Sequence, residues 1–178
     1  MGTLHAGIVG AGRIGRAHIA AIRSTGLADV EAVAMRDADR AGSVAKELGI
    51  PAYYGDYHDL VADPRVDVVH VCAPNVSHYE ICKAAVLAGK PVLCEKPLAI
   101  SAAQSGELLD LSIARNVKTA VNFVYRHYAA VKELRDIISG GGLGDIYAAH
   151  GEYLQDWLLC DSDYDWRVES SSGGPSRA

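Results

Sequence analysis

The chain has 178 residues, of which 49% are hydrophobic and 22% charged, which is the balance of an ordinary globular protein. Its formal net charge of −5, with acids and bases interspersed, argues against nucleic acid or an anionic membrane surface as the main partner. No apolar run approaches the roughly 18–20 residues of a membrane span, and the amino-terminal residues lack a signal-peptide pattern, so we expect a cytoplasmic protein.

Short apolar segments alternate with amphipathic helical patterns over about the first 120 residues. The predicted elements are strands over 4–10, 30–35, 53–54, 66–73, 91–97 and 118–123, with helices from 14 and over 38–48, 77–88 and 101–115. This alternation requires crossover connections, which are typical of a parallel sheet. The prediction is an α/β fold with a Rossmann-type, doubly wound parallel sheet over residues 1–122.

The pattern changes after Phe123. A helix is expected over Ala129–Ser139, then a glycine run and a long strand over Asp145–Leu158, followed by a Ser/Gly-rich tail. A second sheet normally needs several paired strands, and this segment supplies about one. Residues 123–178 are therefore interpreted as the start of an incomplete α+β domain.

The turn between the first strand and the first helix has the sequence Gly10-Ala11-Gly12-Arg13-Ile14-Gly15. In that context Gly10 permits a tight turn, Gly12 lets the backbone approach a pyrophosphate, and Gly15 allows close packing of helix on strand. The helix N-terminus offers free N–H groups to the phosphates. We expect Gly10, Gly12, Arg13, Ile14 and Gly15 to bind a dinucleotide.

The end of the second strand bears on the choice of dinucleotide. An NAD-selecting enzyme usually carries an acidic residue there, and this chain has Met35 followed by Arg36. A guanidinium can pair with the 2′-phosphate of NADP. The sequence favours NADP through Arg36, but Asp37 keeps NAD open if the strand ends two residues later.

Polar residues follow the fourth and fifth predicted strands. Ligands of doubly wound sheets bind beyond the carboxyl ends of the strands, so these residues face the glycine turn's crevice. A cation there would stabilise developing alkoxide character during alcohol oxidation, which makes Lys96 the predicted catalytic residue. The four cysteines have no metal-like spacing, and no metal site is expected. The further cofactor-site candidates are Ala73, Pro74, Asn75, His78, Glu95 and Lys96 itself.

At these residues the chain resembles the Gfo/Idh/MocA oxidoreductases, the glucose–fructose oxidoreductase and inositol dehydrogenase family. The matching segments are GAGRIG at 10–15, APNVSH at 73–78, EKP at 95–97, NFVYR at 122–126, GLGDI at 142–146 and WR at 166–167. The resemblance implies that Lys96 lies near the nicotinamide and the substrate hydroxyl and that Glu95 helps fix the site. It also implies that Pro74–His78 borders the cofactor. Asn122, Arg126, Trp166 and Arg167 join the candidate site on the same ground.

The resemblance implies an NAD(P)-dependent oxidoreductase acting on a sugar, cyclitol or similar polyol, with subunit contacts made by a complete second domain. In that family an Asp and a His of the proton relay follow a Gly-Gly stretch like Gly173-Gly174, and this sequence ends at Ala178 before either. We therefore expect dinucleotide binding with little or no turnover by the chain alone. The alternatives are a non-catalytic NAD(P)-binding regulatory or sensor module, which the presence of Lys96 disfavours, and a fragment without function.

Overall fold

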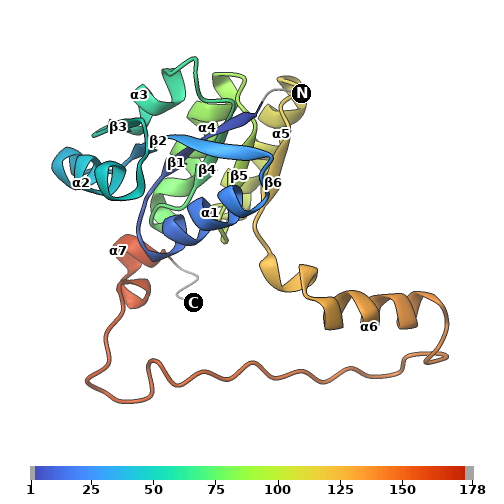
Figure 1. Cartoon of the computed structure of the whole chain (residues 1–178). Helices are drawn as coiled ribbons and strands as arrows, with labels where there is room; N and C mark the ends of the chain where they lie inside the picture. Colours follow the sequence, from blue (N-terminus) through green and yellow to red (C-terminus); the bar gives the residue numbers. More distant parts are fainter. Residues whose placement is uncertain (1–2, 175–178) are drawn as a thin grey trace.

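A computed structural model describes residues 3–174. Its centre is a six-stranded parallel sheet in the order β3-β2-β1-β4-β5-β6 (Figure 1). The strands are β1 (Leu4–Val9), β2 (Ala28–Ala34), β3 (Ala52–Tyr54), β4 (Val68–Val71), β5 (Val92–Cys94) and β6 (Thr119–Val121). The order reverses between β1 and β4, which confirms the predicted doubly wound Rossmann sheet.

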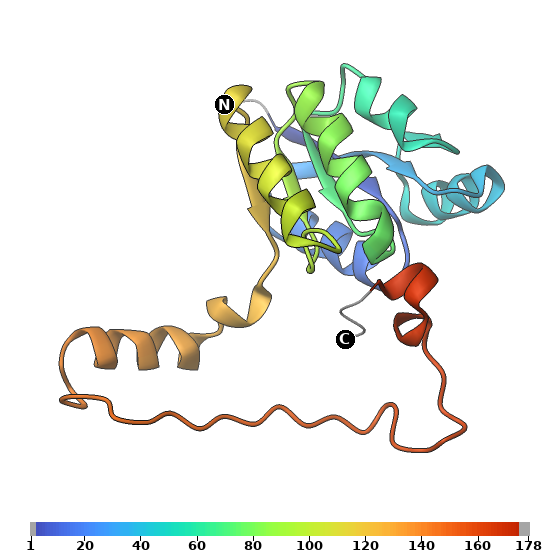
Figure 2. The same ribbon diagram turned by 180° about the vertical axis from the view of Figure 1, so that it is seen from behind.

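Helices cover both faces of this sheet (Figures 1 and 2). In chain order they are α1 (Arg13–Ser24), α2 (Ala38–Leu48), α3 (Tyr57–Ala62), the 3-10 turn η1 (Asn75–Ser77), α4 (His78–Leu87) and α5 (Ala102–Ala114). The helix starts follow from local chemistry, since the side chains of Asp37, Asp56 and Ser101 each accept a backbone hydrogen bond at their N-caps. Gly89, with φ of 75°, follows α4 and terminates it, as the sequence predicted.

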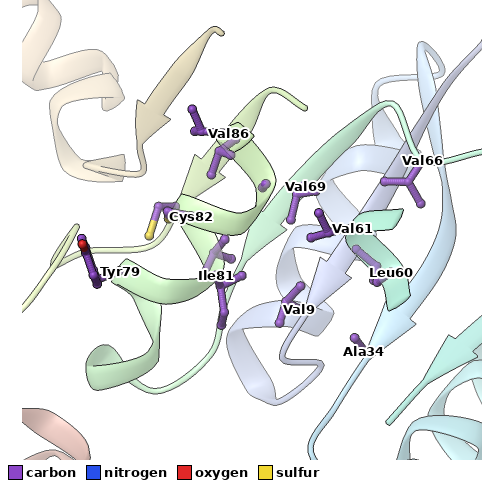
Figure 3. Close-up of a cluster of buried hydrophobic side chains, with 14 of the residues drawn as sticks. Val9, Ala34, Leu60, Val61, Val66, Val69, Tyr79, Ile81, Cys82 and Val86 are labelled. Carbon is purple, nitrogen blue, oxygen red and sulfur yellow. The ribbon is translucent and has the colours of Figure 1, made fainter. Parts of the chain in front are cut away.

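The core is divided into two apolar layers by the sheet. On one face, side chains of α1 and α2 such as Ile19, Ile22 and Val44 pack on Ile8 and Val33. On the other, α3, α4 and α5 contribute a larger cluster; its labelled members in Figure 3 include Leu60, Ile81, Cys82 and Val86. Because both faces are buried, the central strands are almost continuously apolar, as the sequence indicated.

The five strand ends that border the candidate site lie in one register. Ala34, Val9, Val71, Cys94 and Val121 are successive partners across the sheet. The residues that follow them therefore emerge side by side at the same edge. They are Met35, Gly10, Cys72, Glu95 and Asn122.

The segment after Phe123 differs from its prediction in one respect. The expected helix is present as α6 (Ala129–Ser139), after the 3-10 turn η2 (Val124–His127). The long strand predicted over Asp145–Leu158 is wrong, because these residues form no strand. A strand needs a hydrogen-bonded neighbour, and the described chain places none beside this segment.

The polypeptide leaves the sheet after β6, extends away through α6, and returns as a long irregular segment (Figures 1 and 2). It ends against the body at η3 (Trp166–Val168) and α7 (Ser170–Gly173), which contacts η1. Among residues 3–174, none of the helices combines the length and apolar character needed to cross a bilayer.

Candidate active site at the carboxyl edge of the sheet

The glycine turn is shaped by close backbone contacts. Gly10 has φ of 92°, and a Cβ there would lie 2.6 Å from the carbonyl oxygen of Cys72. A Cβ on Gly15 would clash with the carbonyl oxygen of Gly10, so α1 packs directly on the turn. These two positions require glycine for steric reasons.

Gly12 has a different environment. A Cβ placed on it would meet no atom within 4 Å, so the space in front of the turn is open. Gly12 is also the N-cap of α1, makes no side-chain cap, and is followed by no acidic residue in the first turn. The N–H groups at this helix start are thus left for a ligand, and an anion such as a pyrophosphate fits the open space.

The end of β2 is tied to this turn, since the Gly10 amide donates to the carbonyl oxygen of Ala34 over 2.9 Å. Arg36 is exposed two residues beyond Ala34. The Asp37 carboxylate accepts from the Arg40 amide over 3.0 Å as the cap of α2. Oδ1 of Asp37 therefore has a structural task, and the Arg36 side chain, two residues beyond Ala34, is exposed to solvent.

The loop after β4 is fixed by His78, whose side chain was predicted to lie at the cofactor. The residue is 1% exposed, so its ring cannot contact a bound cofactor directly, which corrects that expectation. Its Nδ1 lies 2.7 Å from the carbonyl oxygen of Pro97 and its Nε2 lies 2.8 Å from that of Ala73. His78 thus joins the two loops that border the crevice, and its contribution to the site is to hold them.

Asn75 is also turned inward. It is 7% exposed and donates through Nδ2 to the carbonyl oxygen of Gly173 over 3.0 Å. Pro74, next to it, is exposed. A Cβ on Gly174 would lie 2.7 Å from Ile100, so this end of the chain packs tightly on the body.

Lys96 is exposed at the end of β5, and the carboxylate of Glu95 beside it is held from several sides. Glu95 Oε1 accepts from Asn122 Nδ2 over 2.6 Å and lies 3.0 Å from His18 Nε2. The Lys96 amide donates to Glu95 Oε2 over 3.3 Å. Burial alone would raise the pKa of Glu95, but the hydrogen bonds from His18 and Asn122 outweigh it and hold that pKa below its usual range.

His18 and His70, which were not predicted as site residues, lie beside Glu95. His18 Nδ1 lies 3.0 Å from His70 Nδ1, and burial lowers the pKa of His70 to about 4, helped by the nearby His18. The available signal was periodicity, since His18 shares the buried face of α1 with Gly15, Ile19 and Ile22. A histidine in an apolar stripe is a candidate for a buried hydrogen-bond partner.

The remaining candidates lie on the carboxyl-terminal segment. Arg126 is exposed on η2. The Arg167 guanidinium lies 4.7 Å from the ring centroid of Trp166 and 3.0 Å from Asp165, so these residues support one another in η3. Tyr125, also missed, hydrogen-bonds Tyr153 over 2.6 Å. The structure joins Asn122 to Glu95 and brings α7, which follows Trp166 and Arg167, to the β4 loop.

Comparison with known proteins decides the family. A model described as an oxidoreductase family with an NAD-binding Rossmann fold, GFO_IDH_MocA, matches residues 4–123. The chain belongs to the Gfo/Idh/MocA oxidoreductases. It is 32% identical to levoglucosan dehydrogenase of Pseudarthrobacter phenanthrenivorans over 98% of the chain and 47% of that protein. It is 38% identical to inositol 2-dehydrogenase of Salmonella typhimurium over 85% of the chain and 46% of that protein.

Solved structures give the same result. A levoglucosan dehydrogenase in complex with NADH and levoglucosan superposes with a TM-score of 0.90 at 32% identity, over 97% of this chain and 49% of that one. An NAD-binding oxidoreductase from Klebsiella pneumoniae gives a TM-score of 0.83 at 31% identity, over 97% and 48%. The chain spans about half the length of these relatives. The resemblance to this family and the NAD(P)-binding Rossmann fold are thus confirmed.

Proposed function

We propose that the chain carries the cofactor-binding half of an NAD(P)-dependent dehydrogenase that acts on a sugar, cyclitol or similar polyol. The observation that carries the proposal is the register of the strand ends, which places Gly10, Glu95 and Asn122 along one edge beside the exposed Lys96. Relatives of this chain that are inositol and levoglucosan dehydrogenases support the substrate class.

In this proposal the dinucleotide's phosphates contact the turn of Gly10, Gly12, Arg13, Ile14 and Gly15, because that turn is open and presents free N–H groups. A bound nicotinamide supplies the hydride acceptor or donor. The Lys96 ammonium stabilises negative charge on the substrate oxygen as its proton leaves. Glu95, itself held by Asn122 and His18, keeps the Lys96 backbone in place. The loop of Ala73, Pro74 and Asn75, together with Arg126, Trp166 and Arg167, borders this space.

We propose a preference for NADP over NAD. The exposed Arg36 lies beyond β2 beside the glycine turn, where a 2′-phosphate on the adenosine ribose would be close to it. One oxygen of the neighbouring Asp37 carboxylate, Oδ1, already accepts a hydrogen bond at the cap of α2. An exposed guanidinium at this position favours the phosphate over two ribose hydroxyls.

We also propose that the segment from residue 123 belongs to a second domain that supplies substrate contacts, a proton relay and a subunit interface in a complete enzyme. Several large apolar side chains of this segment are exposed, which supports that role; they include Leu134, Ile137, Tyr147, Leu154 and Leu159. Turnover by the chain alone is then expected to be weak or absent.

The test is a thermal-shift series with the purified chain. NADPH alone should raise the melting temperature, and one class of polyol, such as inositol or levoglucosan, should raise it further when NADPH is present. Lys96→Met should remove the second increment and retain the first. Stabilisation by dinucleotide without any polyol effect would support a sensor module, and the absence of both effects would overturn the proposal.

A further inference from the structure

We propose that His18 is a positioning residue for Lys96, acting through the Glu95 carboxylate, and that it ties the phosphate-binding helix α1 to the catalytic strand end. This inference rests on the proposed function. Four side chains from four elements form the network: His18 on α1, His70 on β4, Glu95 after β5 and Asn122 after β6.

The hydrogen-bond chemistry fixes where one proton resides. Glu95 has a lowered pKa and is ionised near neutral pH, so its oxygens only accept. His18 Nε2, 3.0 Å from Glu95 Oε1, must therefore carry a hydrogen. Asn122 Nδ2 donates to the same oxygen. Asn122 Nδ2 and His18 Nε2 lie 3.3 Å apart, as two donors that share one acceptor do. The lone acceptor is Glu95, which both neighbours orient.

The other side of the His18 ring is occupied by His70. The two Nδ1 atoms lie 3.0 Å apart, so one donates to the other, and the rings meet edge to face with a centroid distance of 5.3 Å. His18 is 8% exposed and cannot turn away to solvent. The imidazole is consequently held at both nitrogens, with a single orientation toward Glu95.

Glu95 passes this constraint to Lys96 through the backbone. Its second oxygen, Oε2, accepts from the Lys96 amide over 3.3 Å, so the carboxylate bridges the imidazole and the main chain of the catalytic residue. His18 stands one turn along α1 from Gly15, in the helix whose first turn would hold the pyrophosphate. A shift of α1 on cofactor binding would thus reach Lys96 through three hydrogen-bonded groups.

A matched pair of substitutions separates positioning from simple packing. In His18→Gln the side-chain amide reaches the place of Nε2 and can still donate to Glu95. In His18→Asn the amide reaches only the place of Nδ1 and keeps the contact with His70. The two variants have similar polarity, so a difference between them reports on the contact with Glu95. Two signals are compared between them: the NMR resonance of the Lys96 amide, and the ratio of the Kd values for NADP⁺ and NADPH.

The ratio reports on the Lys96 ammonium, because a nearby cation disfavours the positively charged oxidised ring. The wild-type chain should bind NADPH several-fold more tightly than NADP⁺, and Lys96→Met should reduce that difference. We expect His18→Gln to keep both the amide resonance and the ratio. His18→Asn should move the amide resonance and shift the ratio toward that of Lys96→Met.

Long-range ¹H–¹⁵N NMR of the imidazoles gives a readout without cofactor, in which His18 should be protonated at Nε2 as long as Glu95 is ionised. The inference is overturned if Nε2 is unprotonated, if both His18 variants keep the wild-type signals, or if both lose them equally. If the NMR results hold but no dinucleotide binds, the proposed function fails while the network itself stands.

Discussion

Asn75 and Gly173 are 98 residues apart in sequence and are joined by a buried hydrogen bond of 3.0 Å between the Asn75 side-chain amide and the Gly173 carbonyl oxygen. This bond holds the end of the described chain against the loop that follows β4. Together with the packing of α7 on η1, it places the segment that follows Trp166 and Arg167 beside the loop after β4. A polar contact between sequence-distant segments therefore helps to position this end of the chain.

Asn75→Ala should release this segment. The Gly173 carbonyl would lose its partner in a buried position, which costs about 1–2 kcal/mol. Hydrogen exchange across 166–174 should accelerate by about five- to thirtyfold, whereas exchange in α2 (Ala38–Leu48), which packs on β2 and β3, should not change. Equal acceleration in both segments would point to global destabilisation and contradict the assignment.

The two glycines Gly12 and Gly15 should behave differently when replaced by alanine. In Gly12→Ala the added Cβ meets no protein atom, so unfolding free energy should change by less than about 1 kcal/mol while dinucleotide affinity falls tenfold or more. In Gly15→Ala the Cβ meets the Gly10 carbonyl oxygen and should destabilise the fold by about 1–3 kcal/mol. Chemical denaturation and NADPH titration measure the two effects, and the same pattern in both variants would contradict this division.

Arg36→Glu tests the choice of dinucleotide. The guanidinium is replaced by a carboxylate that repels a 2′-phosphate and can accept from ribose hydroxyls, so NADPH affinity should fall more than tenfold and NADH affinity should hold or improve. Arg40→Glu, on the exposed surface of α2, is the charge-matched control and should leave the ratio nearly unchanged. A parallel loss of both affinities in Arg36→Glu would remove the argument for NADP.

The half-buried His70 gives the fold a pH dependence of defined sign. Its folded pKa of about 4 lies below the ordinary value of 6.5, so between these values the unfolded chain binds more protons. The contribution of His70 to the free energy of unfolding should be constant above about pH 6.5. It should then fall by about 2–3 kcal/mol as the pH drops to 4. His70→Gln should flatten the slope in urea denaturation, and His150→Gln, which alters an exposed histidine, should not.

The sequence predicted the sheet well because its strands are buried on both faces and its turns carry glycine and helix caps. The strand boundaries differ by only a few residues, as at β4, predicted over 66–73 and found at Val68–Val71. The strand expected over Asp145–Leu158 was wrong for a physical reason. Pairing depends on a neighbouring strand, and no local pattern shows whether that neighbour exists.

The site was predicted less completely than the fold. The glycine turn and Lys96 have local motifs, so their positions follow from the sequence. His18 and His70 are assigned to the site only by tertiary contacts. The two partners of His18, which are His70 and Glu95, lie 52 and 77 residues away from it in the sequence. For His78, at the start of the helix after β4, the sequence predicted a place at the ligand, and the structure encloses its ring between two carbonyl oxygens.

Calorimetric titration of the folded chain with NADPH and NADH, repeated on Gly12→Ala, tests whether the glycine turn binds a dinucleotide. We expect one saturable site per chain for the wild type, tighter for NADPH, and loss of that site in a variant that melts normally. Binding of neither nucleotide to a cooperatively folded wild-type chain, or undiminished binding to Gly12→Ala, would contradict this expectation.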